Sequence, residues 1–127
     1  MSKIPDNCRY TKDHEWIRVE DDGIAVIGIT DFAQQELSDI VYVEVETIGE
    51  NLDDGDVFGI VEAVKTTSDL FMPIAGEVIA FNETLDGSPE TINEDPYGEG
   101  WIAKVKPADP ADLEGLLSPE AYEAAIS

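Results

Sequence analysis

The lysine at position 65 is the residue of this sequence best placed to offer a reactive amine. It is the only basic residue between Arg18 and Lys104. Two short apolar runs, over residues 57–64 and 70–74, lie on either side of Lys65 and the polar residues that follow it. This pattern predicts a β-hairpin whose turn lies at or beside Lys65. The alternative is an ordinary solvated lysine in a surface turn.

Most other kinds of chemical site are absent from the sequence. His14 is the only histidine and Cys8 the only cysteine, so neither a multi-histidine metal centre nor a cysteine zinc site can form. The sequence has no glycine-rich phosphate loop, no dinucleotide fingerprint and no Gly-x-Ser-x-Gly nucleophile. A pair of carboxylates for acid–base work stays open, since acids are abundant. A calcium site is a second alternative, with candidate ligands Asp53, Asp54 and Asp56, although the spacing of an EF-hand is absent.

The length of 127 residues indicates one domain, large enough for a real hydrophobic core. No apolar run approaches the roughly 20 residues that span a bilayer, and the N-terminus lacks the apolar segment of a signal peptide. A single cysteine excludes an internal disulfide and fits a reducing compartment. We therefore expect a cytoplasmic protein.

The charge is strongly negative. Asp and Glu number 29 against 7 Lys and Arg, which gives a formal net charge of −22. Such a surface repels nucleic acid and anionic membranes, so both are excluded as partners. The acids are spread through periodic segments that contain apolar residues, which indicates a folded domain and not a disordered acidic tail. A halophilic source is consistent with this excess, because dissolved cations screen the repulsion.

The elements around Lys65 read mainly as strands. Alternating or β-branched segments predict strands at residues 14–19, 24–29, 40–46, 57–64, 76–82 and 101–106. Thr30 and Asp31 are capping residues before one short helix at 32–37. Residues 83–96 read as a polar loop with a turn. Within 40–46, we expect Val41, Val43 and Val45 to face inward.

The C-terminal part is expected to be helical. One short helix is predicted at 111–117, capped by Asp109, and a second begins at residues 118–120. Five residues are spaced to form one apolar stripe against the sheet: Leu113, Leu116, Leu117, Tyr122 and Ile126. The fold class expected is therefore mainly β, a flattened β-sandwich or barrel-sandwich hybrid with one short internal helix and C-terminal helices. We expect a single domain over residues 1–127, with a core at about 8–106 and a helical segment at about 108–127.

Several stretches resemble a known family. The residues around Lys65, Glu62-Ala63-Val64-Lys65, Ser68-Asp69 and Met72 to Val78, resemble the attachment hairpin and following strand of the lipoyl-domain superfamily. The resemblance narrows to the H proteins of the glycine cleavage system through three further stretches: His14-Glu15-Trp16; Gly28 to Asp31 with Ala33-Gln34; and Pro96-Tyr97 with Gly100-Trp101. It covers about residues 4 to 125, and it implies a fold of lipoyl-domain type.

The resemblance implies that Lys65 carries lipoic acid as an amide. Biotin carriers share the fold, but their lysine lies between two methionines, whereas Val64 and Thr66 flank it here. Glu62 and Asp69 bracket the lysine, and they are candidates for recognition by the ligase or for contact with the arm. The alternative for both is a solvated acid on a hairpin.

By the same resemblance, the loaded arm folds into a cleft beside the hairpin. Glu15 is the residue expected to contact the aminomethyl group, with Asp69 second, because a carboxylate suits a cationic amine. His14 is expected to pack or to form hydrogen bonds. The sequence departs from the family at Ala63, where a serine is usual, and at the helix containing Phe32 and Glu36, where a histidine is common.

The implied function is that of a non-catalytic carrier. Its expected partners are the pyridoxal-phosphate glycine decarboxylase (P protein), the tetrahydrofolate-dependent aminomethyltransferase (T protein), dihydrolipoyl dehydrogenase (L protein), and a lipoate ligase or octanoyltransferase. We expect a monomer. One alternative is an H-like protein that relays octanoyl or lipoyl groups to other acceptors. Another is an unmodified acidic β-domain that acts in protein–protein contacts.

Overall fold

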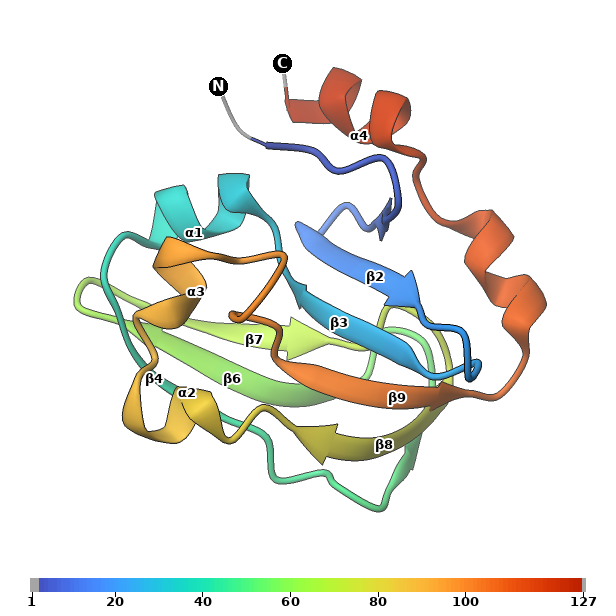
Figure 1. The fold of residues 1–127 in the computed structure, drawn as a ribbon, viewed down its shortest axis with the longest axis horizontal. Helices are drawn as coiled ribbons and strands as arrows, with labels where there is room; N and C mark the ends of the chain where they lie inside the picture. Colours follow the sequence, from blue (N-terminus) through green and yellow to red (C-terminus); the bar gives the residue numbers. More distant parts are fainter. Residues whose placement is uncertain (1–2, 127) are drawn as a thin grey trace.

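The computed structural model describes residues 3–126 and consists of two β-sheets with short helices at their margins (Figure 1). The six-stranded sheet has the order β1 (Arg9–Tyr10), β2 (Glu15–Val19), β3 (Ala25–Ile29), β9 (Ala103–Pro107), β8 (Gly76–Phe81) and β5 (Asn51–Leu52). The three-stranded sheet has the order β4 (Ile40–Glu44), β6 (Val57–Ala63) and β7 (Thr67–Phe71). The predicted mainly β, sandwich-like fold is confirmed. Residues 1, 2 and 127 of the expected domain lie outside the described residues.

The main core lies between the two sheets. Every residue of β3 is buried, as its β-branched composition predicts. Ile17 and Ile27 of the six-stranded sheet pack in one cluster with Val43 and Val61 of the three-stranded sheet. Burial of such side chains provides most of the stabilisation, about 1.5–3 kcal/mol for each large one. This core fixes the position of the β6–β7 hairpin.

The predicted internal helix forms where its capping residues indicate. Helix α1 (Asp31–Leu37) begins after Thr30, whose Oγ1 accepts a hydrogen bond from the Ala33 amide at 3.2 Å. Helical spacing predicts that Phe32, Ala33 and Leu37 pack on the sheet. Ala33 and Leu37 pack against the main core, whereas Phe32 packs on the ring of His14. The helix ends at Ser38, which has a positive φ of 64°.

The expectation of a polar loop over residues 83–96, and of a single internal helix, is wrong. This segment contains two short helices, α2 (Thr84–Gly87) and α3 (Thr91–Glu94). Each of them buries one aliphatic side chain, Leu85 or Ile92, in the main core. One apolar residue per turn produces no helical periodicity in the sequence, and neither helix has a side-chain cap.

The inward orientation expected for Val41 is also wrong, because its side chain is 52% exposed. The pairing of β4 with β6 shifts register between Ile40 and Tyr42. An extra residue in one strand interrupts the alternation of faces. Val43 is buried as predicted, and Val45 is partly buried against the core.

The C-terminal segment forms the 3-10 helix η1 (Pro110–Gly115) and helix α4 (Pro119–Ile126), and Asp109 caps η1 as predicted. The single apolar stripe is wrong, because its residues separate into two clusters. Leu113 and Leu116 pack on the main core, whereas the other members join a second cluster on Tyr10 and Trp16: Leu117, Tyr122 and Ile126. A backbone bridge between Tyr10 and Leu117 leads the chain into that second cluster.

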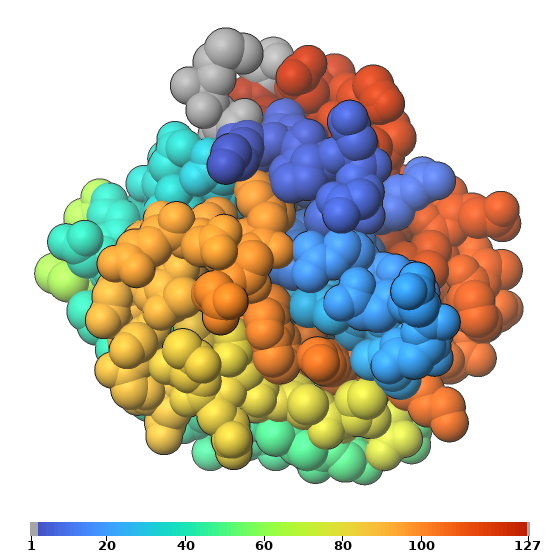
Figure 2. Space-filling model, in the orientation of Figure 1, coloured from blue at the N-terminus to red at the C-terminus, as the bar shows by residue number. Residues whose placement is uncertain are grey.

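The two ends of the described chain lie against each other on one face of the molecule (Figures 1 and 2). The Tyr10 ring stacks on the Tyr122 ring of α4 at a centroid distance of 4.7 Å. Cys8 is buried in the same cluster. Among the residues described, no helix is long and apolar enough to cross a membrane.

Candidate functional site

Lys65 lies at the tip of the β6–β7 hairpin, as predicted. The last cross-strand pair joins Glu62 to Thr67, and the Ala63 amide donates to the Thr66 carbonyl at 2.7 Å to close the turn. The Val64 amide also donates to the Asp39 carbonyl at 3.0 Å, which ties the tip to the segment before β4. The turn projects at the left edge of the molecule in Figure 1.

The side chain of Lys65 is open to solvent. The residue is exposed, as are Val64 and Thr66 on either side. Within residues 3–126, the single ion pair joins Arg18 to Glu20, so no carboxylate pairs with the lysine. The strands on both sides hold this exposed turn in a fixed place.

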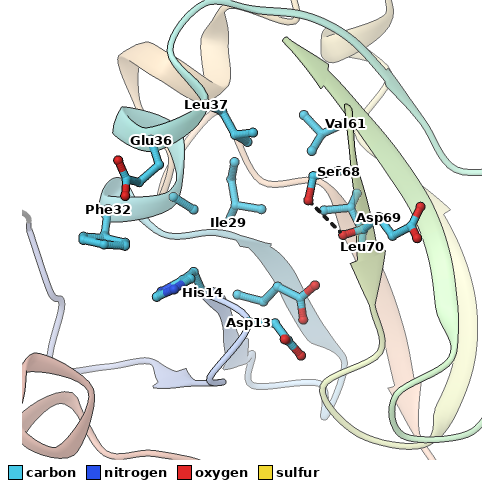
Figure 3. Close-up of a pocket in the computed structure, with 12 residues that line it drawn as sticks. Asp13, His14, Ile29, Phe32, Glu36, Leu37, Val61, Ser68, Asp69 and Leu70 are labelled. Carbon is cyan, nitrogen blue, oxygen red and sulfur yellow. Dashed lines mark hydrogen bonds between the residues drawn. The ribbon is translucent and has the colours of Figure 1, made fainter. Parts of the chain in front are cut away.

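A cavity of about 280 Å³ lies beside the hairpin (Figure 3). Three segments enclose it: the residues that lead into β2, the helix α1, and strand β7. Its lining mixes apolar and acidic side chains: Asp13, His14, Glu15, Ile29, Phe32, Ala33, Glu36, Leu37, Val61, Ser68, Asp69 and Leu70. Because no lysine or arginine is among these described residues, the cavity suits an apolar chain that ends in a cation.

Glu15 is the most unusual group in this cavity. It is 2% exposed, and its Oε2 accepts a hydrogen bond from the Phe71 amide at 2.6 Å. Its other oxygen, Oε1, is buried without a hydrogen-bond partner among the residues described. Burial raises the pKa of Glu15 to about 8, although the hydrogen bond from Phe71 opposes the change. A cationic group that reached Oε1 would supply the missing partner and favour the carboxylate.

Glu15 also borders a second cavity of about 440 Å³. Asp13 lines both cavities, so these two acids separate the spaces. The second cavity lies between the same segment before β2, the turn at Asp54 and Gly55, and the end of η1.

The two acids of the hairpin, Glu62 and Asp69, are less buried than Glu15. In the ladder, Asp69 is paired with Ile60 and Glu62 with Thr67, so both acids lie on the face opposite the buried Val61. Asp69 is exposed and borders the cavity, and in Figure 3 its carboxylate points away from Ile29 and Leu37. Glu62 does not line the cavity. The structure thus brings Glu15 and Asp69 to one cavity, with Asp69 at its margin.

His14 makes the hydrogen bond and the packing contact expected of it. Its Nδ1 lies 2.9 Å from the Tyr122 hydroxyl, and its ring packs on Phe32 at a centroid distance of 4.7 Å. Burial lowers the pKa of His14, against the opposite effects of Asp13 and Glu36. Phe32 lies in the helix where related proteins commonly carry a histidine, and here its ring packs against His14.

Sequence reasoning missed Asp13, Glu36 and Ser68 as cavity residues. Ser68 belongs to a family-like stretch and Glu36 to the helix that departs from the family, but nothing in the sequence assigned any of the three to a cavity, and only the folded arrangement brings them together. The acidic turn proposed for calcium forms an ordinary turn, in which the Asp53 amide donates to Asp56 Oδ2 at 2.8 Å. Within residues 3–126 no group of three potential ligands is placed to hold a metal ion.

Comparisons with known proteins agree with this arrangement. The family model described as "Glycine cleavage H-protein" matches residues 8–127. A glycine cleavage system H protein from Bacteroides thetaiotaomicron is 56% identical over 124 residues, which are 98% of this chain and 98% of that protein. One from Chromohalobacter salexigens is 52% identical over 127 residues, 100% of this chain and 97% of that protein.

The fold is similar to a solved structure as well. The crystal structure of a glycine cleavage system H protein from Mycobacterium marinum matches with a TM-score of 0.86 at 37% identity. The match covers 95% of this chain and 97% of that one. An exposed hairpin lysine beside an acidic cavity, a sequence match over nearly the whole chain and a shared fold lead to one conclusion: this chain belongs to the glycine cleavage H-protein family.

Proposed function

We propose that this chain is the lipoyl carrier of a glycine cleavage system, with lipoic acid joined as an amide to Lys65. The observation that carries the proposal is the placement of an exposed amine at the tip of a hairpin whose strands border a cavity with an unpartnered carboxyl oxygen. Membership of the family supports it.

The residues present fit a lipoyl arm. Ser68 of the cavity wall is three residues from Lys65, so an arm on the lysine starts close to the cavity. Ile29, Leu37 and Leu70 supply an apolar lining for an alkyl chain. A lipoyl group held by these residues would supply a disulfide as the acceptor of the aminomethyl carbon.

Glu15 has a specific task in this proposal. An aminomethyl cargo is a cation near neutral pH, and a buried carboxylate that lacks one hydrogen-bond partner can bind it. The arriving ammonium offsets the burial that keeps Glu15 protonated, so the carboxyl loses its proton as the cation binds. Retention of the cargo in the cavity excludes water, which would otherwise release it as formaldehyde and ammonia.

In this role the chain catalyses no step itself. It takes the aminomethyl group from the pyridoxal-phosphate decarboxylase (P protein) and gives it to the aminomethyltransferase (T protein), and dihydrolipoyl dehydrogenase (L protein) reoxidises the arm. A lipoate ligase or octanoyltransferase loads Lys65, with Glu62 and Asp69 as recognition residues. The chain acts as one monomeric carrier domain in the cytoplasm, where its lone cysteine stays reduced.

Timed release of formaldehyde tests the proposal. Lipoylated protein is loaded with glycine and its decarboxylase, and formaldehyde is then measured after the enzyme is removed. We expect the wild type to load, and Glu15→Ala to load but to release about ten- to a hundredfold faster, the value of a charge-assisted hydrogen bond. Glu50→Ala, which removes an exposed loop carboxylate, should release at the wild-type rate.

Two results would oppose the proposal in different ways. If a competent decarboxylase cannot load the wild type, the carrier function is wrong and a relay of octanoyl or lipoyl groups takes its place. If Glu15→Ala loads and releases no faster than Glu50→Ala, the carrier function stands and the role given to Glu15 is wrong.

A further inference from the structure

The hydroxyl of Tyr122 joins two walls of the cavity from outside. Tyr122 lies on α4, is 1% exposed and does not line the cavity itself. Its oxygen lies 2.9 Å from His14 Nδ1, in the wall before β2, and 2.7 Å from Thr30 Oγ1, which caps α1. Because α1 supplies the second wall, a single hydroxyl on the C-terminal helix holds both walls.

The direction of these hydrogen bonds follows from the protons available. Thr30 is fully buried, and its Oγ1 already accepts from the Ala33 amide at 3.2 Å. The hydroxyl proton of Thr30 needs an acceptor, and the Tyr122 oxygen is the one within reach. Tyr122 is then free to donate its own proton to His14 Nδ1. In that arrangement His14 is neutral, with its proton on Nε2.

Hydrogen bonds and ring contacts hold His14 in an unusual backbone conformation. Its φ is +65°, in the left-handed region that non-glycine residues rarely adopt. Its amide donates to the Thr11 carbonyl at 3.1 Å, and its carbonyl accepts from the Thr30 amide at 3.0 Å. The ring is then held between Phe32 and Tyr122. Because Glu15 follows His14 directly, the position of the histidine also sets that of the carboxyl.

The charges that face His14 make its protonation state important. Asp13 and Glu15 adjoin it on its own segment, and Glu36 faces it from α1. Asp13 and Glu36 favour an imidazolium, yet burial lowers the pKa of His14, and a hydrogen bond from Tyr122 would favour the neutral ring further. A charged imidazolium beside Glu15 would repel an ammonium and compete for the carboxylate.

We propose that Tyr122 is a positioning residue, which ties the cavity walls together and keeps His14 neutral, so that the cavity accepts a cationic group on the Lys65 arm. The inference rests on the proposed carrier function. It gives the C-terminal helix a part in retaining the cargo, although no residue of that helix lines the cavity.

Tyr122→Phe removes the hydroxyl and keeps the ring, and Tyr10→Phe is the matched control. Tyr10 is buried in the same cluster and stacks on Tyr122, but its hydroxyl donates to the Pro5 carbonyl at 2.6 Å and contacts neither wall. His14 is the only histidine, so its ring nitrogens can be followed by nitrogen-15 NMR without assignment. The full-length lipoylated chain is used throughout.

We expect Nδ1 of His14 to be unprotonated in the wild type and in Tyr10→Phe. In Tyr122→Phe, the loss of the donor to the neutral ring should raise the pKa of His14 and allow both tautomers. A wild-type ring protonated at Nδ1, or a His14 titration that is the same in both tyrosine variants, would overturn the inference.

Release of cargo provides the functional readout. We expect Tyr122→Phe to release formaldehyde about two- to tenfold faster than Tyr10→Phe, the effect of one lost hydrogen bond, with a larger difference at pH 6 than at pH 8. In a His14→Gln background, which cannot become charged, the difference between the two tyrosine variants should no longer change with pH. Equal release by the two tyrosine variants would also overturn the inference.

The two proposals fail separately. A wild type that takes no cargo contradicts the carrier function alone, because the histidine spectra still decide whether Tyr122 keeps His14 neutral.

Discussion

At the scale of single residues, the buried carboxyl of Glu15 is the group through which the fold would bind the proposed cationic cargo. Its carboxyl is placed by one backbone hydrogen bond from β7 and otherwise lies in a space that offers no partner among the described residues. Proteins rarely bury such an oxygen, because desolvation costs about 1–3 kcal/mol when no hydrogen bond replaces water. The unpartnered oxygen of Glu15 therefore lowers the stability of the folded state, and it leaves the carboxyl able to bind a cation.

A pH series of Glu15→Gln tests this cost. The pKa of Glu15 is raised from 4.5 to about 8, so between these values the folded state keeps a proton that the unfolded state releases. Stability from this group is therefore complete below about pH 4.5 and declines as the pH rises to 8, by at most about 1.4 kcal/mol per pH unit. Glutamine does not titrate, so the variant should gain stability relative to the wild type between pH 5 and pH 8.

Chemical denaturation at each pH measures the difference in free energy of unfolding. Glu50→Gln is the control, because it removes an exposed carboxylate from a loop. A difference between Glu15→Gln and the wild type that stays constant from pH 5 to pH 8 would show that the pKa of Glu15 is not raised.

At the scale of helices and strands, the sequence predicts those elements whose formation depends on residues that are close together in the chain. The buried strand β3, the Thr30 cap of α1 and the turn at Lys65 each follow from residues next to one another in the chain. The bulge in β4 and the short helices α2 and α3 could not be predicted in this way, because they depend on how single residues pack in the folded protein. The cavity has the same origin: Glu15 and Asp69 could be named from family resemblance, but Asp13, Glu36 and Ser68 could not.

One interaction of an unpredicted helix should be essential to β4. Asn93 of α3 accepts from the buried Ile40 amide at 3.0 Å, and its amide group donates to Gln34 Oε1 and to the Ser38 carbonyl at 3.0 Å and 2.7 Å. Asn93→Ala leaves the Ile40 amide without its acceptor, and we expect a loss of about 1–3 kcal/mol in urea unfolding. Asn51→Ala, at an exposed position of β5, should stay within about 0.5 kcal/mol of the wild type. Equal losses would show that α3 does not hold the start of β4.

At the scale of the whole molecule, charge dominates. The chain has 29 acids and 7 bases, and the single ion pair among its described residues leaves most of the acids without a cation beside them. Mutual repulsion opposes the compact state, most strongly at low ionic strength. The same field repels anionic surfaces.

The melting temperature should therefore rise from low salt to molar KCl. Exposed charges a Debye length apart, about 10 Å at 0.1 M, repel each other until salt screens them. Thermal unfolding followed by circular dichroism measures the change, and sorbitol at equal osmolality is the control for excluded-solute effects. An unchanged melting temperature in KCl would show that the acids are too widely spaced to matter, and a halophilic origin would lose its support.

The central claim is that Lys65 is the point of lipoyl attachment. Intact mass and peptide mapping of protein made in cells that supply lipoate and a lipoate ligase test it most directly, with Lys65→Arg and Lys104→Arg compared. Arginine keeps the positive charge but offers no amine that can be acylated. We predict one lipoyl group on the peptide that contains Lys65, the same group in Lys104→Arg, and none in Lys65→Arg. A lipoyl group on another lysine, or an unmodified wild type, would contradict the account.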